Sequence, residues 1–210
     1  MHKKLVIAGI GTEVGKTIVS AIVTEALAAD YWKPVQAGEL EHADTDKVRE
    51  LISNSVSHFH PETYRLKAAM SPHAAAALEN LQLSLNDIHL PETQNTLVIE
   101  LAGGIMVPLN NDTLNLDLLK HWNIPVLLVS RNYLGSINHT LLSVEVLKHN
   151  RIPIAGIIFN GESNTATEEL ILNYTGIELI GQIGNLNTIN KKTIQDLAQQ
   201  FKPSLIRLLQ

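Results

Sequence analysis

The chain has no cysteine among its 210 residues, so disulfide bonds, thiolate catalysis and cysteine-ligated metal sites are excluded. It has no block of basic residues, and its net charge of −5 argues against a surface for nucleic acid. No hydrophobic run approaches the roughly 18 apolar residues of a membrane span, and the apolar run near the first residue is too short for a secretory signal. We therefore expect a cytoplasmic protein that binds neither nucleic acid nor membrane.

Short apolar runs alternate with amphipathic stretches along the chain. The runs are rich in Val and Ile and lack polar alternation, which is typical of strands that are covered on both faces. They are Leu5–Ile10, Leu97–Leu101, Val126–Val129, Ile154–Phe159 and Leu179–Ile183. Helical spacing of apolar residues marks Thr17–Ala29, Ile137–His149 and, more weakly, Asn190–Phe201.

This order predicts one α/β domain over residues 1–210, with a mostly parallel sheet that is flanked by helices. We expect the polar segment 53–70 to be a surface loop. Ligands of such sheets bind beyond the carboxyl ends of the strands, so the loops after the apolar runs are the candidate sites.

The strongest motif is Gly-Ile-Gly-Thr-Glu-Val-Gly-Lys-Thr at residues 9–17, between a predicted strand and a predicted helix. This context predicts a P-loop, whose backbone N–H groups surround phosphate oxygens at a helix N-terminus. Lys16 would then contact the β- and γ-phosphates, and the Thr17 hydroxyl would bind Mg²⁺. The spacing departs from the usual four residues between glycines, because Gly9 and Gly15 enclose five and Gly11 and Gly15 enclose three.

Charged residues in three other segments are candidates for the same site. Lys33 follows the short run Tyr31-Trp32, and it is either a solvated strand end or a group that stabilises charge on a transferring phosphoryl group. Asp44 and Asp46 are either helix-start carboxylates or Mg²⁺ ligands. Glu100 ends an otherwise apolar strand, where an unpaired carboxylate would be costly, so it fits a second Mg²⁺ ligand.

Two helix starts and one turn are also candidates. Ser71-Pro72 begins an alanine-rich helix pattern, and a glycine loop enters the helix at Ile137. Both helix N-termini can hold an anion. Asn160-Gly161 is either a simple turn or a site at which the Asn160 amide forms hydrogen bonds with the edge of an adenine base, as donor and acceptor.

Taken together and in order, several motifs resemble dethiobiotin synthetase from about residue 5 to about residue 183. They are Gly-Thr-Glu-Val-Gly-Lys-Thr, Lys-Pro-Val-Gln-Ala-Gly, Thr-Asp-Lys, Ser-Pro-His, Glu-x-Ala-Gly-Gly, Leu-Gly-x-Ile-Asn-His-Thr and Asn-Gly. The resemblance implies a homodimeric, Mg²⁺-dependent enzyme of biotin synthesis with a P-loop NTPase-like fold. Such an enzyme uses ATP to join CO₂ to 7,8-diaminopelargonic acid and closes the ureido ring through a carbamate and a carbamic-phosphoric anhydride.

The resemblance also implies a role for each matching residue. Lys16 and Lys33 would stabilise the transferring phosphoryl group, and Thr17, Asp46 and Glu100 would hold Mg²⁺. The residues that would bind the nucleotide are Glu13, Val14, Gly15, Lys16, Thr17, Ile18, Asp46, Glu100, Gly103, Asn160 and Gly161. The residues that would bind the diamine are Ala37, Ser71, Ile137 and Asn138, of which the last two can come from the partner subunit.

At several positions the chain departs from the family pattern. Gly11 stands where the family often has aspartate, and Ala37 replaces a hydroxyl residue. Gly184 replaces a proline, and Leu101 replaces a glycine, with bulk that is expected near the reacting phosphate.

Two other functions are compatible with a P-loop. One is a non-catalytic, regulatory ATP-binding domain of the same fold, against which the retained Lys16, Lys33, Asp46 and Glu100 argue. The other is a partitioning-type ATPase switch. Such switches carry an additional lysine near the start of the P-loop, and residues 10–14 contain none.

Overall fold

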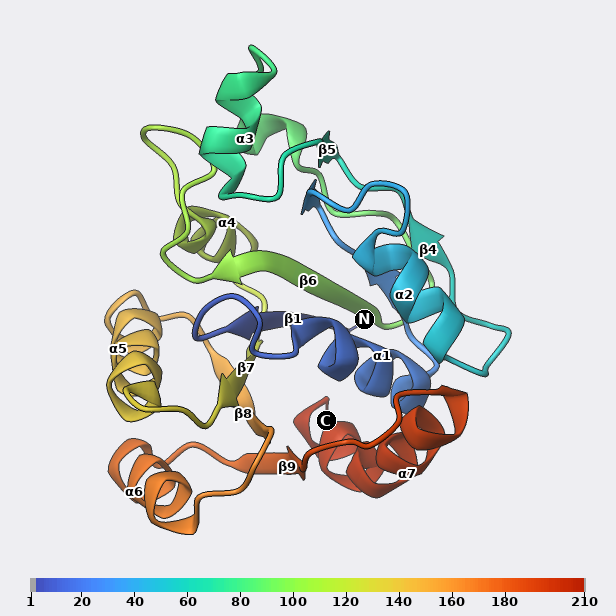
Figure 1. Ribbon diagram of the computed structural model, residues 1–210, viewed down its shortest axis with the longest axis vertical. Helices are drawn as coiled ribbons and strands as arrows, with labels where there is room; N and C mark the ends of the chain where they lie inside the picture. The colour runs from blue at the N-terminus through green and yellow to red at the C-terminus, as the bar shows by residue number, and fades with distance from the viewer. Residues whose placement is uncertain (1–2, 210) are drawn as a thin grey trace.

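The computed structural model describes residues 3–209 as a central seven-stranded sheet between two layers of helices (Figure 1). The strand order is β4-β2-β6-β1-β7-β8-β9, and every paired neighbour is parallel. A second, two-stranded parallel sheet joins β3 and β5. The strands are β1 (Lys4–Gly9), β2 (Asp30–Trp32), β3 (Val35–Ala37), β4 (Phe59–His60), β5 (Tyr64–Leu66), β6 (Leu97–Gly104), β7 (Val126–Arg131), β8 (Ile154–Asn160) and β9 (Leu179–Ile183).

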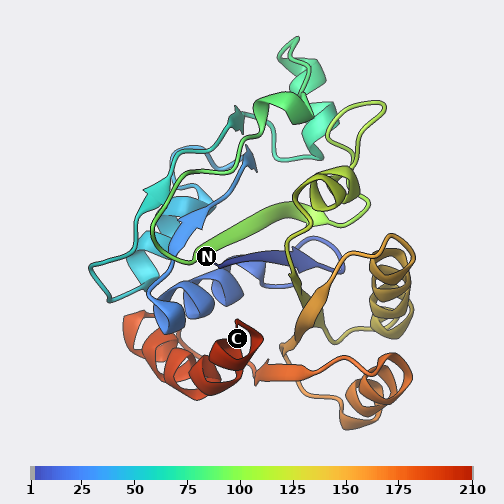
Figure 2. The same cartoon turned by 180° about the vertical axis from the view of Figure 1, so that it is seen from behind.

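Helices cover both faces of the sheet, as Figures 1 and 2 show from opposite sides. One face packs against α1, α2 and α7, and the other against α4, α5 and α6, each with its own apolar core. The helices are α1 (Lys16–Leu27), α2 (Asp44–Leu51), α3 (Pro72–Leu78), α4 (Asn115–Trp122), α5 (Ser136–His149), α6 (Thr165–Thr175) and α7 (Lys191–Leu208), with a short 3₁₀ helix at Leu85–Asp87.

The five apolar runs and the three helical patterns predicted from the sequence are confirmed. All five runs are strands, and the predicted helices correspond to α1, α5 and α7. The runs had no polar alternation because both faces of the sheet are covered, so side chains on either side of each strand are buried.

The prediction of a surface loop over residues 53–70 is wrong in part. This segment contains β4, which extends the main sheet beside β2, and β5, which pairs with β3. Strands of two and three residues are too short for a recognisable alternation of side chains, so the sequence pattern could not reveal them.

The topology brings the candidate loops to one edge of the sheet. β1 lies between β6 and β7 in parallel register, with Ile7 opposite both Glu100 and Leu127. The loops that follow β1, β2, β6 and β8 therefore leave from the carboxyl edge.

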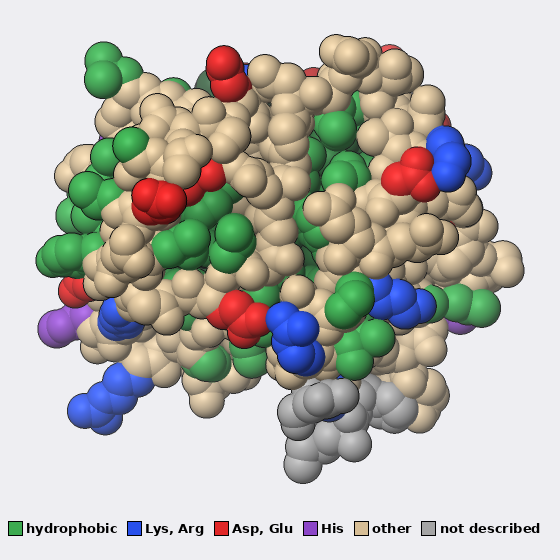
Figure 3. Space-filling view, turned by 90° about the horizontal axis from the view of Figure 1, so that it is seen from below, with side chains coloured by type: hydrophobic (Ala, Val, Ile, Leu, Met, Phe, Trp, Pro, Cys, Tyr) green, Lys and Arg blue, Asp and Glu red, His purple; other side chains and the backbone are tan. Residues whose placement is uncertain are grey.

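Two further observations concern the distribution of surface charge and the apolar character of the helices. Charged side chains of both signs are scattered over the face that Figure 3 shows, and they form no basic patch there. Within residues 3–209, no helix has the length and apolar character needed to cross a lipid bilayer.

Candidate nucleotide and metal site

The predicted P-loop connects β1 to α1. Gly15 lies at the N-cap of α1 with a φ of 93°, a conformation that favours glycine. The first turn of α1 follows directly, and the backbone N–H groups of a first helical turn have no partner within the helix. Lys16 is buried, and its Nζ donates to the Gly11 carbonyl at 3.0 Å. A loop that wraps around a helix N-terminus with a buried ammonium group is suited to bind phosphate.

Asn160, at the end of β8, packs directly against this loop. Its Nδ2 donates to the Val14 carbonyl at 2.9 Å. A Cβ atom on Gly15 would lie 2.1 Å from the same nitrogen, so the contact leaves room for glycine alone. Gly161 follows with a φ of 90°, which turns the chain away from the sheet. The structure therefore brings Asn160 and Gly161 to the P-loop.

Glu100 is the most deeply buried acidic residue at this edge, with an exposed fraction of 0%. Its Oε1 accepts hydrogen bonds from Thr17 Oγ1 at 3.1 Å and from Lys33 Nζ at 3.2 Å. Its Oε2 accepts a hydrogen bond from the Tyr31 hydroxyl at 2.9 Å. The predicted partners Thr17, Lys33 and Glu100 thus meet around one carboxylate, and Tyr31 adds a contact that the sequence reasoning missed.

Lys33 and Asp44 form an ion pair beside Glu100. Burial alone would lower the pKa of Lys33, but the Glu100 and Asp44 carboxylates outweigh it and raise this pKa above its ordinary value. For Asp44, burial opposes the charge, and Lys33 and Lys47 outweigh it, so its pKa is lowered. Lys33 and Asp44 are therefore both charged at neutral pH.

Two other groups at the site have shifted pKa values. Burial is the main cause that lowers the pKa of Lys16; the nearby Lys33 charge adds to it and Glu100 opposes it. Burial and the Glu100 charge raise the pKa of Tyr31 well above its ordinary value, so this hydroxyl keeps its proton and remains a donor.

Lys16, Lys33, Asp44 and Glu100 face a cavity of about 510 Å³. Its charged walls come from the P-loop, from the ends of β2 and β6 and from the start of α2. The lining residues are Thr12, Glu13, Lys16, Lys33, Gln36, Ala37, Asp44, Ala69, Met70, Ser71, Pro72, Glu100, Ala102, Gly103 and Val107. The cavity therefore includes the predicted positions Glu13, Ala37, Ser71 and Gly103.

The structure does not bring Asp46, the predicted metal ligand, to the cavity; Asp44 lines the cavity instead. Asp46 Oδ2 accepts from the Ala43 N–H at 3.1 Å and caps α2, and its Oδ1 pairs with Arg49 at 2.6 Å. Since the two carboxylates are two positions apart on a helix, they point in different directions. The sequence offered both aspartates as candidates, and the residue that the resemblance implied, Asp46, lies outside the cavity.

Ile137 and Asn138 do not reach this cavity. They line a separate cavity of about 800 Å³ between the start of α5 and the β8–α6 loop. Val14 is buried and Ile18 is half-buried beside the P-loop, so they support this loop from within the fold. The structure thus divides the four predicted diamine-binding residues between two cavities of one chain, with Ala37 and Ser71 in one and Ile137 and Asn138 in the other.

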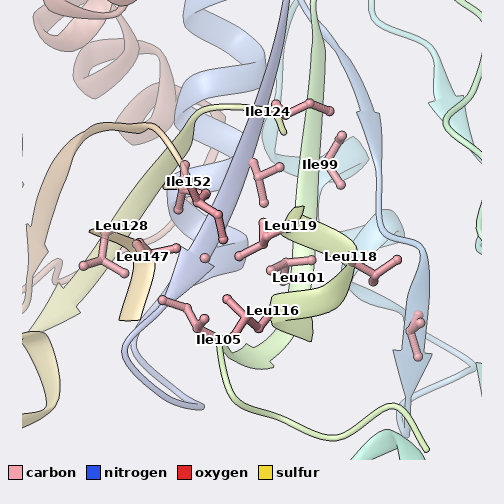
Figure 4. Packing of buried hydrophobic residues seen from close by; sticks show 14 of the residues in the cluster. Ile99, Leu101, Ile105, Leu116, Leu118, Leu119, Ile124, Leu128, Leu147 and Ile152 are labelled. Carbon is pink, nitrogen blue, oxygen red and sulfur yellow. The ribbon is translucent and has the colours of Figure 1, made fainter. Parts of the chain in front are cut away.

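Leu101 does not crowd the phosphate region, contrary to expectation. It has an exposed fraction of 0% and belongs to the apolar core on the α4 side of the sheet. Figure 4 shows it beside Leu116 and Leu119 of α4. Successive residues of a strand point to opposite faces, so Glu100 and Leu101 lie on different sides of β6.

Comparisons with known proteins show similarity over almost the whole chain. The chain matches the family model described as an AAA domain over residues 3–193. It is 48% identical to the ATP-dependent dethiobiotin synthetase of Christiangramia forsetii, over 99% of this chain and 100% of that protein. It is also 41% identical to the ATP-dependent dethiobiotin synthetase of Chlamydia abortus, over 96% and 95% of the two chains.

Among solved structures, the fold is similar to pNOB8 ParA bound to nonspecific DNA, with a TM-score of 0.64, 11% identity and coverage of 100% and 99%. It is also similar to the Pyrococcus furiosus cell division ATPase MinD, with a TM-score of 0.61, 15% identity and full coverage of both chains. At such low identity these two similarities concern the fold alone, and they confirm the predicted P-loop NTPase-like architecture.

Proposed function

Because the chain belongs to the family of ATP-dependent dethiobiotin synthetases, we propose that it closes the ureido ring of dethiobiotin from 7,8-diaminopelargonic acid, CO₂ and ATP. One observation carries the proposal: Lys16, Lys33, Asp44 and Glu100 line one cavity at the N-terminus of α1. Two ammonium groups and two carboxylates in this place suit a metal-bound triphosphate and a transferring phosphoryl group. The whole chain would act as one domain in the cytoplasm.

The reaction needs no nucleophile from the protein. One amine of the diamine adds to CO₂, forms an N–C bond, loses a proton and becomes a carbamate. A carbamate oxygen attacks the γ-phosphorus of ATP, and ADP leaves. The second amine then attacks the carbonyl carbon of the carbamic-phosphoric anhydride and loses a proton, and phosphate leaves as the ring closes. The protein contributes orientation and charge stabilisation.

In this scheme the two lysines act on the transferring phosphoryl group. Lys16 lies at the start of α1, and Lys33 comes from the end of β2, so the ammonium groups reach the cavity from two elements. Lys33 remains charged because its pKa is raised by Glu100 and Asp44. Positive charge held on two rigid elements stabilises the negative charge that develops on the phosphoryl oxygens.

Thr17, Asp44 and Glu100 would hold Mg²⁺. Their side chains suit this ion, since one hydroxyl and two carboxylates supply hard oxygen ligands of the kind that Mg²⁺ prefers. Thr17 Oγ1 and Glu100 Oε1 already lie 3.1 Å apart, and Asp44 lines the same cavity. The bound ion would neutralise charge on the β- and γ-phosphates.

The diamine would lie beside Ala37 and Ser71, which line the same cavity as Lys16 and Lys33. Ile137 and Asn138 line another cavity of the same chain. We propose that they reach the substrate of the partner subunit in a homodimer, where the N-terminus of α5 can hold the substrate carboxylate. Asn160 would contact the adenine base from the end of β8.

The proposal is tested by incubating the purified protein with the diamine, bicarbonate, Mg²⁺ and ATP. We expect ADP and phosphate to appear together with one cyclic urea per ATP, detected by mass spectrometry. Omission of the diamine should abolish ADP release.

Two other results would support the competing functions. ATP hydrolysis that ignores the diamine would favour a nucleotide-driven switch. Nucleotide binding without turnover would favour a regulatory domain.

A further inference from the structure

We propose that Tyr31 is a positioning residue that holds the metal-binding carboxylate of Glu100 in its working orientation. The inference rests on the proposed function, because that function makes Glu100 a Mg²⁺ ligand. Tyr31 itself does not line the cavity. It would act through Glu100 and would touch neither nucleotide nor substrate.

The sheet register brings the two side chains together. β2 pairs with β6 in parallel, and Tyr31 lies opposite Val98. Val98 and Glu100 point to the same face because they are two residues apart on one strand. The side chain of Tyr31 therefore reaches diagonally to Glu100, a spacing that a long aromatic side chain can bridge.

The two oxygens of Glu100 have separate partners. Oε1 faces Thr17 and Lys33, at 3.1 and 3.2 Å. Oε2 is turned into the fold and accepts from the Tyr31 hydroxyl at 2.9 Å. With Oε2 held in this way, Oε1 is directed towards the Thr17 hydroxyl, so both oxygens would be available to one bound Mg²⁺.

The ring of Tyr31 is fixed independently of its hydroxyl. The residue has an exposed fraction of 0%, and its ring packs against Phe59 of β4 with centroids 6.0 Å apart. Tyr31→Phe therefore keeps the packing and removes only the donor to Oε2. The terminal torsion of a glutamate side chain is broad, so without this donor the carboxylate can rotate.

The experiment measures how the binding of a non-hydrolysable ATP analogue depends on the Mg²⁺ concentration. Loss of a hydrogen bond that orients a metal ligand typically weakens metal binding by about 10–100-fold. We therefore expect Tyr31→Phe to raise the Mg²⁺ concentration at half-saturation by about 10–100-fold. Binding of the analogue without Mg²⁺ should be unchanged.

A matched control is Tyr64→Phe. It also removes a hydroxyl that donates to a carboxylate, Asp87 at 2.7 Å, but Asp87, unlike Glu100, does not line the cavity. The Mg²⁺ dependence of this variant should equal that of the wild type. A second measurement uses the Glu100→Gln background, in which adding Tyr31→Phe should cause no further change in half-saturation.

A Tyr31→Phe protein with wild-type Mg²⁺ dependence would overturn the proposal, even if its melting temperature were lower, because that result means a merely structural role. Equal and additive effects in the wild-type and Glu100→Gln backgrounds would also overturn it. Failure of the proposed function is distinguishable, since it would appear as a wild-type protein that binds the Mg²⁺–nucleotide complex without making the cyclic urea.

Discussion

Two buried polar clusters lie at opposite ends of β2, and they satisfy their charges in different ways. At the start of the strand, Asp30 accepts hydrogen bonds from Thr93 Oγ1, Asn95 Nδ2 and the His58 N–H, at 2.5, 2.9 and 2.9 Å. His60 Nε2 adds a contact at 3.3 Å. We call these residues the Asp30 cluster. Each donor comes from a loop or an edge strand of the same chain.

At the other end of β2, Lys33, Asp44, Glu100 and Lys16 form the cavity cluster. Here opposite charges face each other and also face open space of about 510 Å³. The Asp30 cluster surrounds a single charge with donors on several sides, so it closes the fold. The cavity cluster leaves its charges accessible to a ligand. The contrast shows that burial of a charged group identifies a functional site only when a cavity reaches the group.

The largest expected effect of a single substitution is at Lys33. Lys33→Ala should reduce diamine-dependent ADP release by about 10²–10³-fold, because it removes a preorganised positive charge from the phosphoryl group. Lys47→Ala is the matched control, since Lys47 also pairs with Asp44, at 3.3 Å, but does not line the cavity. The melting temperature, measured in parallel, checks that each variant is folded. Equal turnover in the two variants would mean that Lys33 acts as an ordinary ion-pair partner.

A pair of variants tests the assignment of the metal-binding aspartate. Asp44→Asn should lower turnover by about 100-fold, as expected when a metal ion that stabilises transition-state charge loses a ligand. Asp46→Asn should leave turnover unchanged and cost only about 0.5 kcal/mol of stability, because it keeps an oxygen that can accept from the Ala43 N–H and removes only the negative charge at the N-terminus of α2. The reverse order of turnover would restore Asp46 as the ligand.

The Asp30 cluster should affect acid stability and leave turnover unchanged. Burial opposes the charge of Asp30, but its hydrogen bonds outweigh burial and lower its pKa from 3.8 to about 2. Since the folded pKa is below the unfolded one, the stabilisation is present above about pH 4 and is lost as the pH falls to about 2. This shift corresponds to about 2 kcal/mol in the free energy of unfolding.

Asp30→Asn should therefore flatten the acid limb of a denaturation series between about pH 4 and pH 2. At neutral pH the variant should keep wild-type turnover, because Asp30 lies away from the cavity. An unchanged acid limb would show that other carboxylates dominate acid unfolding. A loss of turnover at full stability would mean that the two ends of β2 are coupled.

Local patterns in the sequence predicted much of the fold and part of the site. The apolar runs and the glycine loop before Lys16 can each be recognised from a few neighbouring residues, so the main strands and the P-loop were predictable. The place of Glu100 in the site was also predictable, because a carboxylate at the end of an apolar strand is costly to bury without a partner.

Other features depend on register and direction, which no local pattern encodes. The choice between Asp44 and Asp46 depends on how α2 faces the cavity. Tyr31 reaches Glu100 only because β2 and β6 are paired with Tyr31 opposite Val98. Leu101 appeared close to the phosphate along the chain, yet it points to the opposite face of β6.

The contact between Gly15 and Asn160 has a consequence for how this loop can change over evolutionary time. Any other residue at position 15 meets two independent obstacles, the positive φ of 93° and the amide nitrogen only 2.1 Å from its first side-chain atom. Shortening Asn160 would remove the second obstacle and leave the first. No one-step or two-step path at these positions therefore leads away from glycine without backbone strain, and glycine is expected to persist at position 15 whatever residue stands at position 160.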